Sequence, residues 1–353
     1  MKLFIKKIIR FSYFLPIATI IIIITNYTVD PYGVLRGDMS TQNTEPNQHY
    51  LKVDYIINNP TKFNSFLFGS SRVGKIDIKN IKGDNKWYNM SYSEGLPLEH
   101  LHDIKIFIKN KVKIKKIIIG LDNISYLVDP EIHRNEVMRK PYENFYAPYF
   151  SYFFVKPKYE IIKSALFPEK SEDGFSVKYD IYNSGVPVLK NVDDFINSHP
   201  KEHNLDDKFK KPSWDVLRYK NRTDAAISEI SEIINICDEE NIELEFFINP
   251  MHVTTYLKLD KNNYFTFLSK LSQVTEFYDF SGINEITTNN FNYYETSHYR
   301  PFIGEKIADI IFDKKNIEFP YFGQKVNKFN IDLILNFKES NIKKFSAIYH
   351  NNI

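Results

Sequence analysis

Residues 65–72 read SFLFGSSR, a short apolar run that ends in a glycine, two serines and an arginine. Apolar runs of this length, bounded by turn-forming residues, are typical of buried strands. Comparable runs recur at 86–90, 117–120, 244–250 and 276–280. Because the five runs are short and several are apolar throughout, they predict five strands in a sheet that is covered on both faces.

Longer segments between these runs have the periodicity of helices. Apolar residues recur every three or four positions over about 223–240 and about 303–311, and Pro301 suits the first turn of the second helix. Further helices are expected at 98–110 and near 329–346. Strands that alternate with helices predict a parallel sheet, and such sheets bind their ligands at the carboxyl ends of the strands.

Composition limits the classes of function. The chain has 353 residues with 46 Lys and Arg against 44 Asp and Glu, and this formal net charge of +2 is too small for binding nucleic acid by charge alone. Hydrophobic residues make up 43%, which predicts a globular protein with a substantial core. Cys237 is the single cysteine, so an intramolecular disulfide and a cysteine-based zinc site are excluded. We expect neither a cofactor nor a resident metal.

The N-terminal segment has the pattern of a membrane anchor. The 19 residues from Phe11 to Val29 carry no charge, close to the ~20 that a helix needs to cross a bilayer. Four basic residues precede this run and Asp30 follows it, which predicts a cytoplasmic N-terminus with the rest of the chain outside. The run ends without a small-x-small motif, so an uncleaved anchor is favoured over a cleaved signal peptide or a buried core helix. Abundant Ile, Lys and Asn point to a bacterial source, and hence to a single-pass protein of the inner (cell) membrane with its folded domain on the periplasmic or extracellular side.

The chain divides into four expected parts. Residues 1–29 form a cytoplasmic tip and transmembrane anchor, and segment 30–60, with several Pro and Gly residues, forms a connector. Residues 61–320 form the α/β domain, with an insertion at about 130–220 where Tyr, Phe, Pro and Lys mix without a clear period. Residues 321–353 form a C-terminal tail. We expect the insertion to cap the site or to face the substrate.

Polar residues after the first strand and before a later helix can form a nucleophile and its base. Ser70 and Ser71 follow the strand directly, although a serine at such a place is also a common helix cap. Glu295 and His298 lie three positions apart, so the carboxylate can hold one ring nitrogen and leave the other free. An exposed histidine beside a glutamate is the simpler alternative. Together the two segments predict the members of a catalytic triad.

These segments resemble the SGNH, or GDSL-type, hydrolases, in particular the membrane-anchored branch that acts on bacterial surface polysaccharides. The resemblance spans about 63–313 without the insertion. It implies a flavodoxin-like three-layer αβα sandwich with a parallel five-stranded sheet, an inserted cap region and an N-terminal transmembrane helix. The first family motif ends in the nucleophilic serine, which aligns with Ser71, whereas Ser70 replaces the usual aspartate. The last motif, Asp-x-x-His, becomes Glu295-x-x-His298.

The same resemblance implies an oxyanion hole. The family places a glycine after the second strand, matched here by Gly95, and the N–H of Ser71 is a second donor. The third family motif, Gly-x-Asn-Asp, departs in this chain, which reads GLDN at 120–123. An ionised Asp122 cannot donate a hydrogen bond to an oxyanion. Either Asn123 replaces the family asparagine, or Asp122 has another role such as binding the loop after Ser71.

Three further side chains are candidate substrate ligands. Arg72 and Arg300 lie within the two motif regions and can bind an anionic glycan or a phosphate through bidentate contacts, or else form ordinary ion pairs. His252 follows the fourth predicted strand, and either binds substrate or is a capped or solvent-facing histidine.

The expected function is that of a membrane-anchored extracytoplasmic serine esterase or acyltransferase that handles a small acyl group, acetyl above all, on a cell-envelope glycan. His298 takes the proton of Ser71, which attacks an ester carbonyl, while Glu295 orients the imidazole. The expected partners are the cell-surface glycan as substrate, membrane lipid around the N-terminal helix, and a multi-span membrane acyl carrier of the kind that some relatives use.

Two alternatives stay open. The altered third motif favours a catalytically silent protein that binds glycan or serves as a scaffold in an envelope polysaccharide system. A metal-dependent phosphotransferase is the other alternative, with Asp122, His252, Asp279 and His298 as ligands.

Overall fold

The computed structural model describes residues 2–39, 44–81, 83–142, 146–156, 158–167, 176–212, 220–312 and 321–350. The chain forms two compact units. The N-terminal unit comprises Met1–Asp54 and Glu131–Gly174, and the sheet unit comprises Tyr55–Pro130 and Phe175–Ile353. The expected insertion at 130–220 is therefore shared between the two units. Every candidate site residue belongs to the sheet unit.

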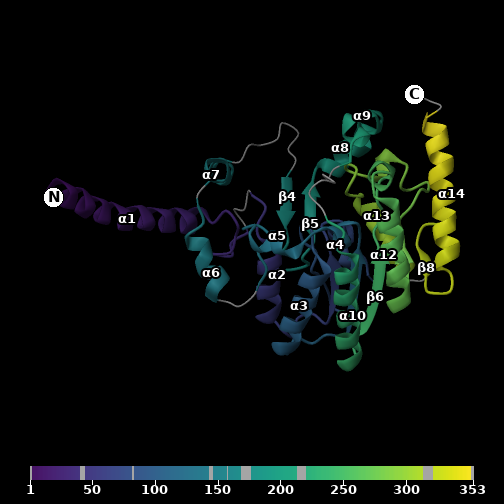
Figure 1. Cartoon of the computed structure of the whole chain (residues 1–353), viewed down its shortest axis with the longest axis horizontal. Helices are drawn as coiled ribbons and strands as arrows, with labels where there is room; N and C mark the ends of the chain where they lie inside the picture. Colours follow the sequence, from purple (N-terminus) through teal and green to yellow (C-terminus); the bar gives the residue numbers. More distant parts are fainter. Residues whose placement is uncertain are drawn as a thin grey trace. The chain divides into compact units, whose positions relative to one another are not determined.

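A six-stranded sheet forms the centre of the sheet unit (Figure 1). Its strands, in spatial order, are β2 (Trp87–Asn89), β1 (Ser65–Gly69), β3 (Lys116–Leu121), β6 (Glu243–Ile248), β7 (Phe277–Asp279) and β8 (Gln324–Val326). The first five pair in parallel, and β8 pairs antiparallel with β7. The mostly parallel sheet and all five predicted strand positions are confirmed. The predicted total of five is wrong by one, because β8 is three residues long with one buried side chain and lies in the segment expected to form a tail.

Helices cover the sheet on both faces. The helices of the sheet unit are α3 (Pro97–Lys109), α4 (Ile124–Leu127), α8 (Val192–Ser198), α9 (Pro200–Leu205), α10 (Thr223–Glu239), α11 (Val253–Tyr256), α12 (Lys261–Val274), α13 (Pro301–Phe312) and α14 (Ile331–His350). On one face, Leu67 and Phe247 of the sheet share a buried core with Ile303 and Ile307 of α13. On the other face, α3 contacts β1 and α10 contacts β6, and α10 packs between α3 and α12.

The predicted helices are confirmed with small shifts at their ends. Helix α10 begins at Thr223 and buries the apolar stripe that includes Ala226, Ile230 and Ile233. Helix α13 begins at Pro301, where the missing N–H has no partner within the helix in any case. Helices α3 and α14 occupy the other two predicted segments.

The strand order places a crevice at one point of the sheet. Strand β1 lies between β2 and β3, so the chain moves to one side of β1 first and then to the other. The order therefore reverses between β1 and β3, and parallel sheets bind ligands beyond the carboxyl ends of their strands at such a reversal. Ser70 and Ser71 follow β1, and Asp122 and Asn123 follow β3.

The part of the insertion that belongs to the sheet unit starts with a hairpin of β4 (Ser176–Tyr179) and β5 (Pro187–Lys190). The loop between these strands bonds to β2, because Tyr88 Oη donates to the carbonyl of Ile181 at 2.6 Å and the N–H of Asn89 donates to the carbonyl of Ser184 at 2.9 Å. Helices α8 and α9 follow this hairpin in the chain.

The N-terminal unit is helical. Its helices are α1 (Lys2–Val29), α2 (Gln48–Ile57, which continues into the sheet unit), α5 (Pro130–Arg134, which starts in the sheet unit), α6 (Tyr146–Phe153) and α7 (Tyr159–Leu166). The amide of Asn26 joins α1 to the end of α6 by donating to the carbonyls of Phe153 at 2.9 Å and Val155 at 2.8 Å. Side chains of α1 are described from Phe14 onward. Among the residues described, no helix has both the length and the apolar character of a membrane span, so the transmembrane element of the predicted fold is not supported.

Candidate active site

The nucleophile candidate lies where β1 ends in a sharp turn. Gly69 has φ +148°, and a Cβ there would lie 2.7 Å from the carbonyl oxygen of Gly120 on the neighbouring strand. A side chain at this position is therefore excluded both by the backbone conformation and by the close approach of β3. The turn places Ser71 at the carboxyl edge of the sheet, where its Oγ lies 2.7 Å from Nε2 of His298.

The base candidate is held by its own loop. Glu295 accepts hydrogen bonds from the N–H groups of Ser297 at 2.6 Å and His298 at 2.9 Å, and its Oε1 also bonds Nδ1 of His298. With a proton on Nδ1 directed at the carboxylate, Nε2 of His298 is left to accept the proton of Ser71. The structure thus brings together the three residues that the sequence placed in a triad, across 227 positions of the chain between Ser71 and His298.

Glu295 is kept ionised by these contacts. Burial alone raises the pKa of its carboxyl, but hydrogen bonds from His298 and Ser297 and the charges of His298 and Arg72 outweigh that effect, so the pKa of Glu295 is lowered. A carboxylate that stays charged orients the imidazole and stabilises its protonated form.

A second set of contacts surrounds the serine turn. Asp122 accepts a hydrogen bond from Ser70 Oγ at 2.6 Å and forms an ion pair with Nη1 of Arg72 at 2.8 Å. Arg72 also donates from Nε to the carbonyl and from Nη2 to Oγ of Ser297, both at 2.9 Å. The expectation that Asp122 binds the loop around Ser71 is confirmed. The guanidinium of Arg72 is buried and all three nitrogens contact the protein, which is the ion-pair alternative, so substrate binding by Arg72 stays a prediction.

The oxyanion candidates differ in how free their donors are. The N–H of Gly95 donates within its own turn to the carbonyl of Tyr92 at 3.3 Å, a long bond, and a Cβ at Gly95 would lie 2.5 Å from the carbonyl oxygen of Gly69. Asn123 is fully buried, and neither its Nδ2 nor its Oδ1 has a hydrogen-bond partner within the described part of the chain. Since an unpaired buried amide costs about 1–3 kcal/mol, Asn123 is the donor that a ligand oxygen could satisfy.

The two remaining substrate-ligand candidates have structural partners instead. Arg300 is 2% exposed, pairs with Asp193 of α8 at 2.7 Å, and lies over the rings of Phe291 and Phe302. His252 caps α11 by accepting the N–H of Thr254 at 3.2 Å, and burial lowers the pKa of its imidazole. The ion-pair alternative for Arg300 and the capped alternative for His252 are thus found in the structure, and contacts of either residue with substrate stay predictions.

The ligand set of the metal alternative is not assembled. Nowhere in the described ranges do three His, Cys, Asp or Glu side chains gather as ligands. Asp122 is bound to Arg72, and Asp279 forms a buried ion pair with Lys338 of α14 at 2.9 Å. The four residues of that alternative thus have separate protein partners.

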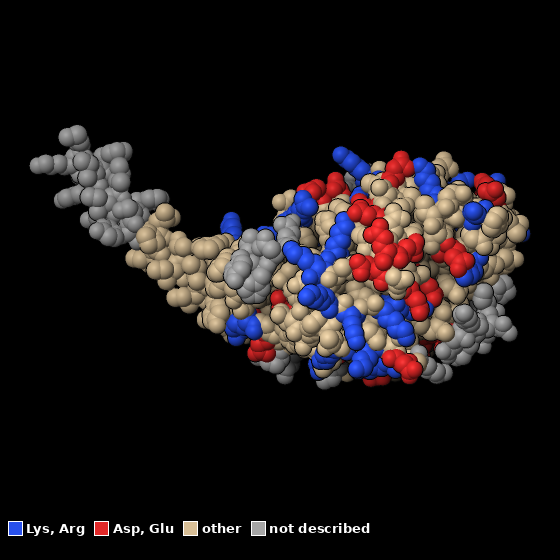
Figure 2. Space-filling model, turned by 90° about the horizontal axis from the view of Figure 1, so that it is seen from below, with Lys and Arg blue, Asp and Glu red and all other residues tan. Residues whose placement is uncertain are grey.

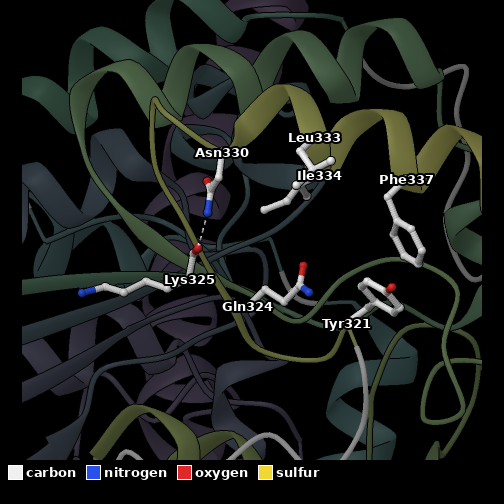
Figure 3. A pocket seen from close by; sticks show the side chains of 7 residues that line it. All are labelled: Tyr321, Gln324, Lys325, Asn330, Leu333, Ile334 and Phe337. Atoms are coloured by element: carbon white, nitrogen blue, oxygen red, sulfur yellow. Dashed lines mark hydrogen bonds between the residues drawn. The ribbon is translucent and has the colours of Figure 1, made fainter.

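A groove of about 430 Å³ lies between β8 and α14, away from the triad (Figure 3). Seven residues line it: Tyr321, Gln324, Lys325, Asn330, Leu333, Ile334 and Phe337. Tyr321 and Phe337 stack with ring centroids 3.6 Å apart, and the amide of Asn330 donates to the carbonyl of Lys325 at 2.9 Å. The groove contains no group that can act as nucleophile or base with the geometry of the Ser71–His298 pair.

Near the site lies a buried lysine for which no sequence pattern gives a signal. Lys75 lies four positions after Ser71, is 9% exposed, and places its ammonium 5.2 Å from the ring centre of Tyr294.

No protein-family model matches the chain, and no curated protein matches it.

Proposed function

We propose that the protein is a serine acyl esterase or acyltransferase of the SGNH type, with Ser71 as nucleophile, His298 as general base and Glu295 as the group that orients the base. The observation that carries this proposal is the continuous hydrogen-bond chain from Ser71 Oγ through His298 to Glu295, with 2.7 Å between Oγ and Nε2. Nucleophile and base within hydrogen-bond reach, and a third group on the base, are the signature of an activated serine.

The finer fold assignment belongs to the same proposal. Counted among the parallel strands alone, the spatial order is 2-1-3-4-5, which is the order of flavodoxin-like doubly wound sheets. Helices on both faces support a three-layer αβα arrangement. The site lies where such sheets bind ligands, between the ends of β1 and β3.

The chemistry follows from the geometry. As Ser71 Oγ attacks the carbonyl carbon of an ester, its proton passes to Nε2 of His298 and the carbonyl electrons move to oxygen. The amide of Asn123 and backbone N–H groups of the turn stabilise this oxyanion. Collapse of the tetrahedral intermediate breaks the bond to the alcohol, which takes the proton from His298 and leaves acyl-Ser71. Water or a sugar hydroxyl then attacks the acyl group while His298 takes its proton, and His298 returns that proton to Ser71 Oγ as the bond to the acyl group breaks.

The proposed substrate is an acylated, above all acetylated, cell-envelope glycan. The face shown in Figure 2 has Lys and Arg interspersed with Asp and Glu, without the single-sign patch that a nucleic-acid partner favours. The proposed location outside the cell membrane, with a multi-span acyl carrier as partner, is supported by the basic residues that precede the uncharged run 11–29 and by the exposed Ile20, Ile21 and Ile24 of α1. Alkaline carbonate extraction of membranes tests the anchor, since an anchored chain stays with the lipid pellet.

A fluorophosphonate probe tests the nucleophile directly. Full-length protein is expected to form one covalent adduct at Ser71 and to hydrolyse p-nitrophenyl acetate, and Ser71→Ala is expected to lose the adduct and about 10⁶-fold in kcat. Ser231→Ala is the matched control, because Ser231 bonds only within α10. A folded wild-type protein without a Ser71-dependent adduct would support the catalytically silent glycan-binding or scaffold alternative.

A further inference from the structure

We propose that Arg72 and Asp122 are positioning residues that fix the distance between nucleophile and base, so that the triad is assembled before substrate arrives. This inference rests on the proposed function of Ser71 and His298. Neither Arg72 nor Asp122 contacts a reacting atom. They act through the two loops that they join.

Arg72 links three separate chain segments, because it belongs to one of them and its guanidinium bonds the other two. It belongs to the turn after β1, its Nη1 pairs with Asp122 after β3, and its Nε and Nη2 hold Ser297 in the loop of His298. Each of its three nitrogens has its own partner, at 2.8 to 2.9 Å. Asp122 completes the arrangement from the other side by accepting from Ser70 Oγ at 2.6 Å. Ser70 and Arg72, on either side of the nucleophile, are thus connected through Asp122 and the guanidinium to Ser297, the residue before the base.

Burial makes this arrangement rigid. The side chains of Arg72 and Asp122 are 4% and 1% exposed, so water cannot replace a lost partner. A buried ion pair gives little net stability, but removal of one partner leaves an uncompensated charge and forces the surrounding loops to rearrange. Because the planar guanidinium presents its donors in a fixed fork, a lysine cannot hold Asp122 and both acceptors of Ser297 together.

Positioning predicts a kinetic pattern that a general loss of stability does not. A displacement of about 1 Å between reacting groups lowers the rate about 10²-fold while leaving substrate contacts in place. Arg72→Ala is therefore expected to lower kcat for p-nitrophenyl acetate about 10²-fold with KM changed less than about threefold. Added guanidinium is expected to restore part of kcat, because it can occupy the space that the truncated side chain leaves.

The experiment compares full-length Arg72→Ala, Arg72→Lys and Arg222→Ala. Arg222 is the matched control, since its guanidinium is also mostly buried and pairs with Glu229 of α10, outside the three joined segments. Arg222→Ala is expected to keep the wild-type kcat and to gain nothing from guanidinium. Arg72→Lys keeps a positive charge beside Asp122, and this variant replaces Arg72→Ala in the experiment if the alanine variant does not fold. It is expected to lose kcat by a similar factor.

A crystal structure of the Arg72 variant gives a readout that does not depend on activity. The distance from Ser71 Oγ to His298 Nε2 is expected to lengthen beyond hydrogen-bond reach. A folded variant that keeps this distance, or that keeps kcat within threefold of wild type, overturns the positioning role. If wild-type protein neither hydrolyses the ester nor reacts with the probe, the proposed function fails, whereas the change in distance still decides whether Arg72 positions His298.

Discussion

Two clusters at the carboxyl edge of the sheet contain the same three kinds of side chain, an aspartate, a serine and a buried cation. The two clusters are Asp122, Ser70 and Arg72 at the ends of β3 and β1, and Asp279, Ser281 and Lys338 at the end of β7. The serine lies 2.6 Å from the aspartate in both, and the cation lies 2.8 Å from the aspartate in the first and 2.9 Å in the second.

The clusters differ in what the cation holds. Arg72 binds Ser297 and so reaches the loop that carries His298. Lys338 binds the carbonyl of Ser281 at 2.7 Å and so fastens α14 to the sheet, beside the groove of Figure 3. A buried ion pair at a strand end is therefore not a functional site by itself. Only the first cluster is joined to a nucleophile and a base, and only there is chemistry expected.

After the loss of the nucleophile itself, the largest expected effect in the first region comes from Glu295→Gln. An amide can donate to Nδ1 of His298 and then leaves the proton on Nε2, where it cannot accept from Ser71. We expect kcat for p-nitrophenyl acetate to fall about 10⁴-fold with the fold intact, as measured by initial rates and circular dichroism. A variant with near wild-type kcat would remove Glu295 from the triad and leave His298 with a different orienting group.

In the second region the expected effect is on stability and not on kcat. Lys338→Ala leaves Asp279 buried and unpaired, which costs about 3–5 kcal/mol in the free energy of unfolding. Lys261→Ala is the control, because Lys261 of α12 pairs with Glu339 of α14 at the surface, where an exposed ion pair contributes little to stability. Urea unfolding measures both. A drop in kcat of folded Lys338→Ala would show that α14 acts on the site and would break the contrast between the two clusters.

Asn123 sharpens the contrast within the first region. If its unpaired amide stabilises the oxyanion, Asn123→Ala lowers kcat about 10²- to 10³-fold. The free energy of unfolding is expected to change little, because truncation also removes a buried polar group that has no partner in the described structure. Unchanged kcat together with lower stability would make Asn123 a packing residue and leave the oxyanion to backbone donors.

The five parallel strands, the four helices named from periodicity, and the meeting of Ser71, His298 and Glu295 could be predicted from the sequence, because each has a local signal. Apolar runs end in Gly69-Ser70-Ser71, and Glu295 lies three positions before His298. The partners of Arg72 could not be predicted, because Asp122 and Ser297 come from segments 50 and 225 positions away that only the folded sheet brings together. Strand β8 had too short an apolar pattern to be recognised.

The protein partners of the candidate substrate ligands could not be predicted either, because they too come from distant segments. A charged residue near a motif has the same local signal whether it faces solvent, a ligand or another buried charge. Arg300 binds Asp193, which is 107 positions away, and no periodicity or spacing in the sequence indicates such a partner.

Lys75 is a further buried cation, and it belongs to neither of the two clusters. Within the described chain its ammonium has no hydrogen bond or ion pair, and burial lowers its pKa from 10.5 to about 8, although Asp193 and Glu295 oppose the shift. A folded-state pKa below the unfolded value means that the charged lysine destabilises the fold below about pH 8, and that this loss is recovered as pH rises from about 8 to 10.5.

Lys75→Met is therefore expected to raise the free energy of unfolding at pH 7 by up to about 3 kcal/mol, which is the pKa difference expressed as energy. Most of that gain is expected to disappear by pH 10, since the wild-type lysine is then largely neutral in the fold. Exposed Lys79→Met is the matched control, and is expected to change the free energy of unfolding by less than about 0.5 kcal/mol at either pH. A gain that is absent at pH 7, or that grows toward pH 10, would mean that Lys75 is satisfied in the fold as Arg72 and Lys338 are.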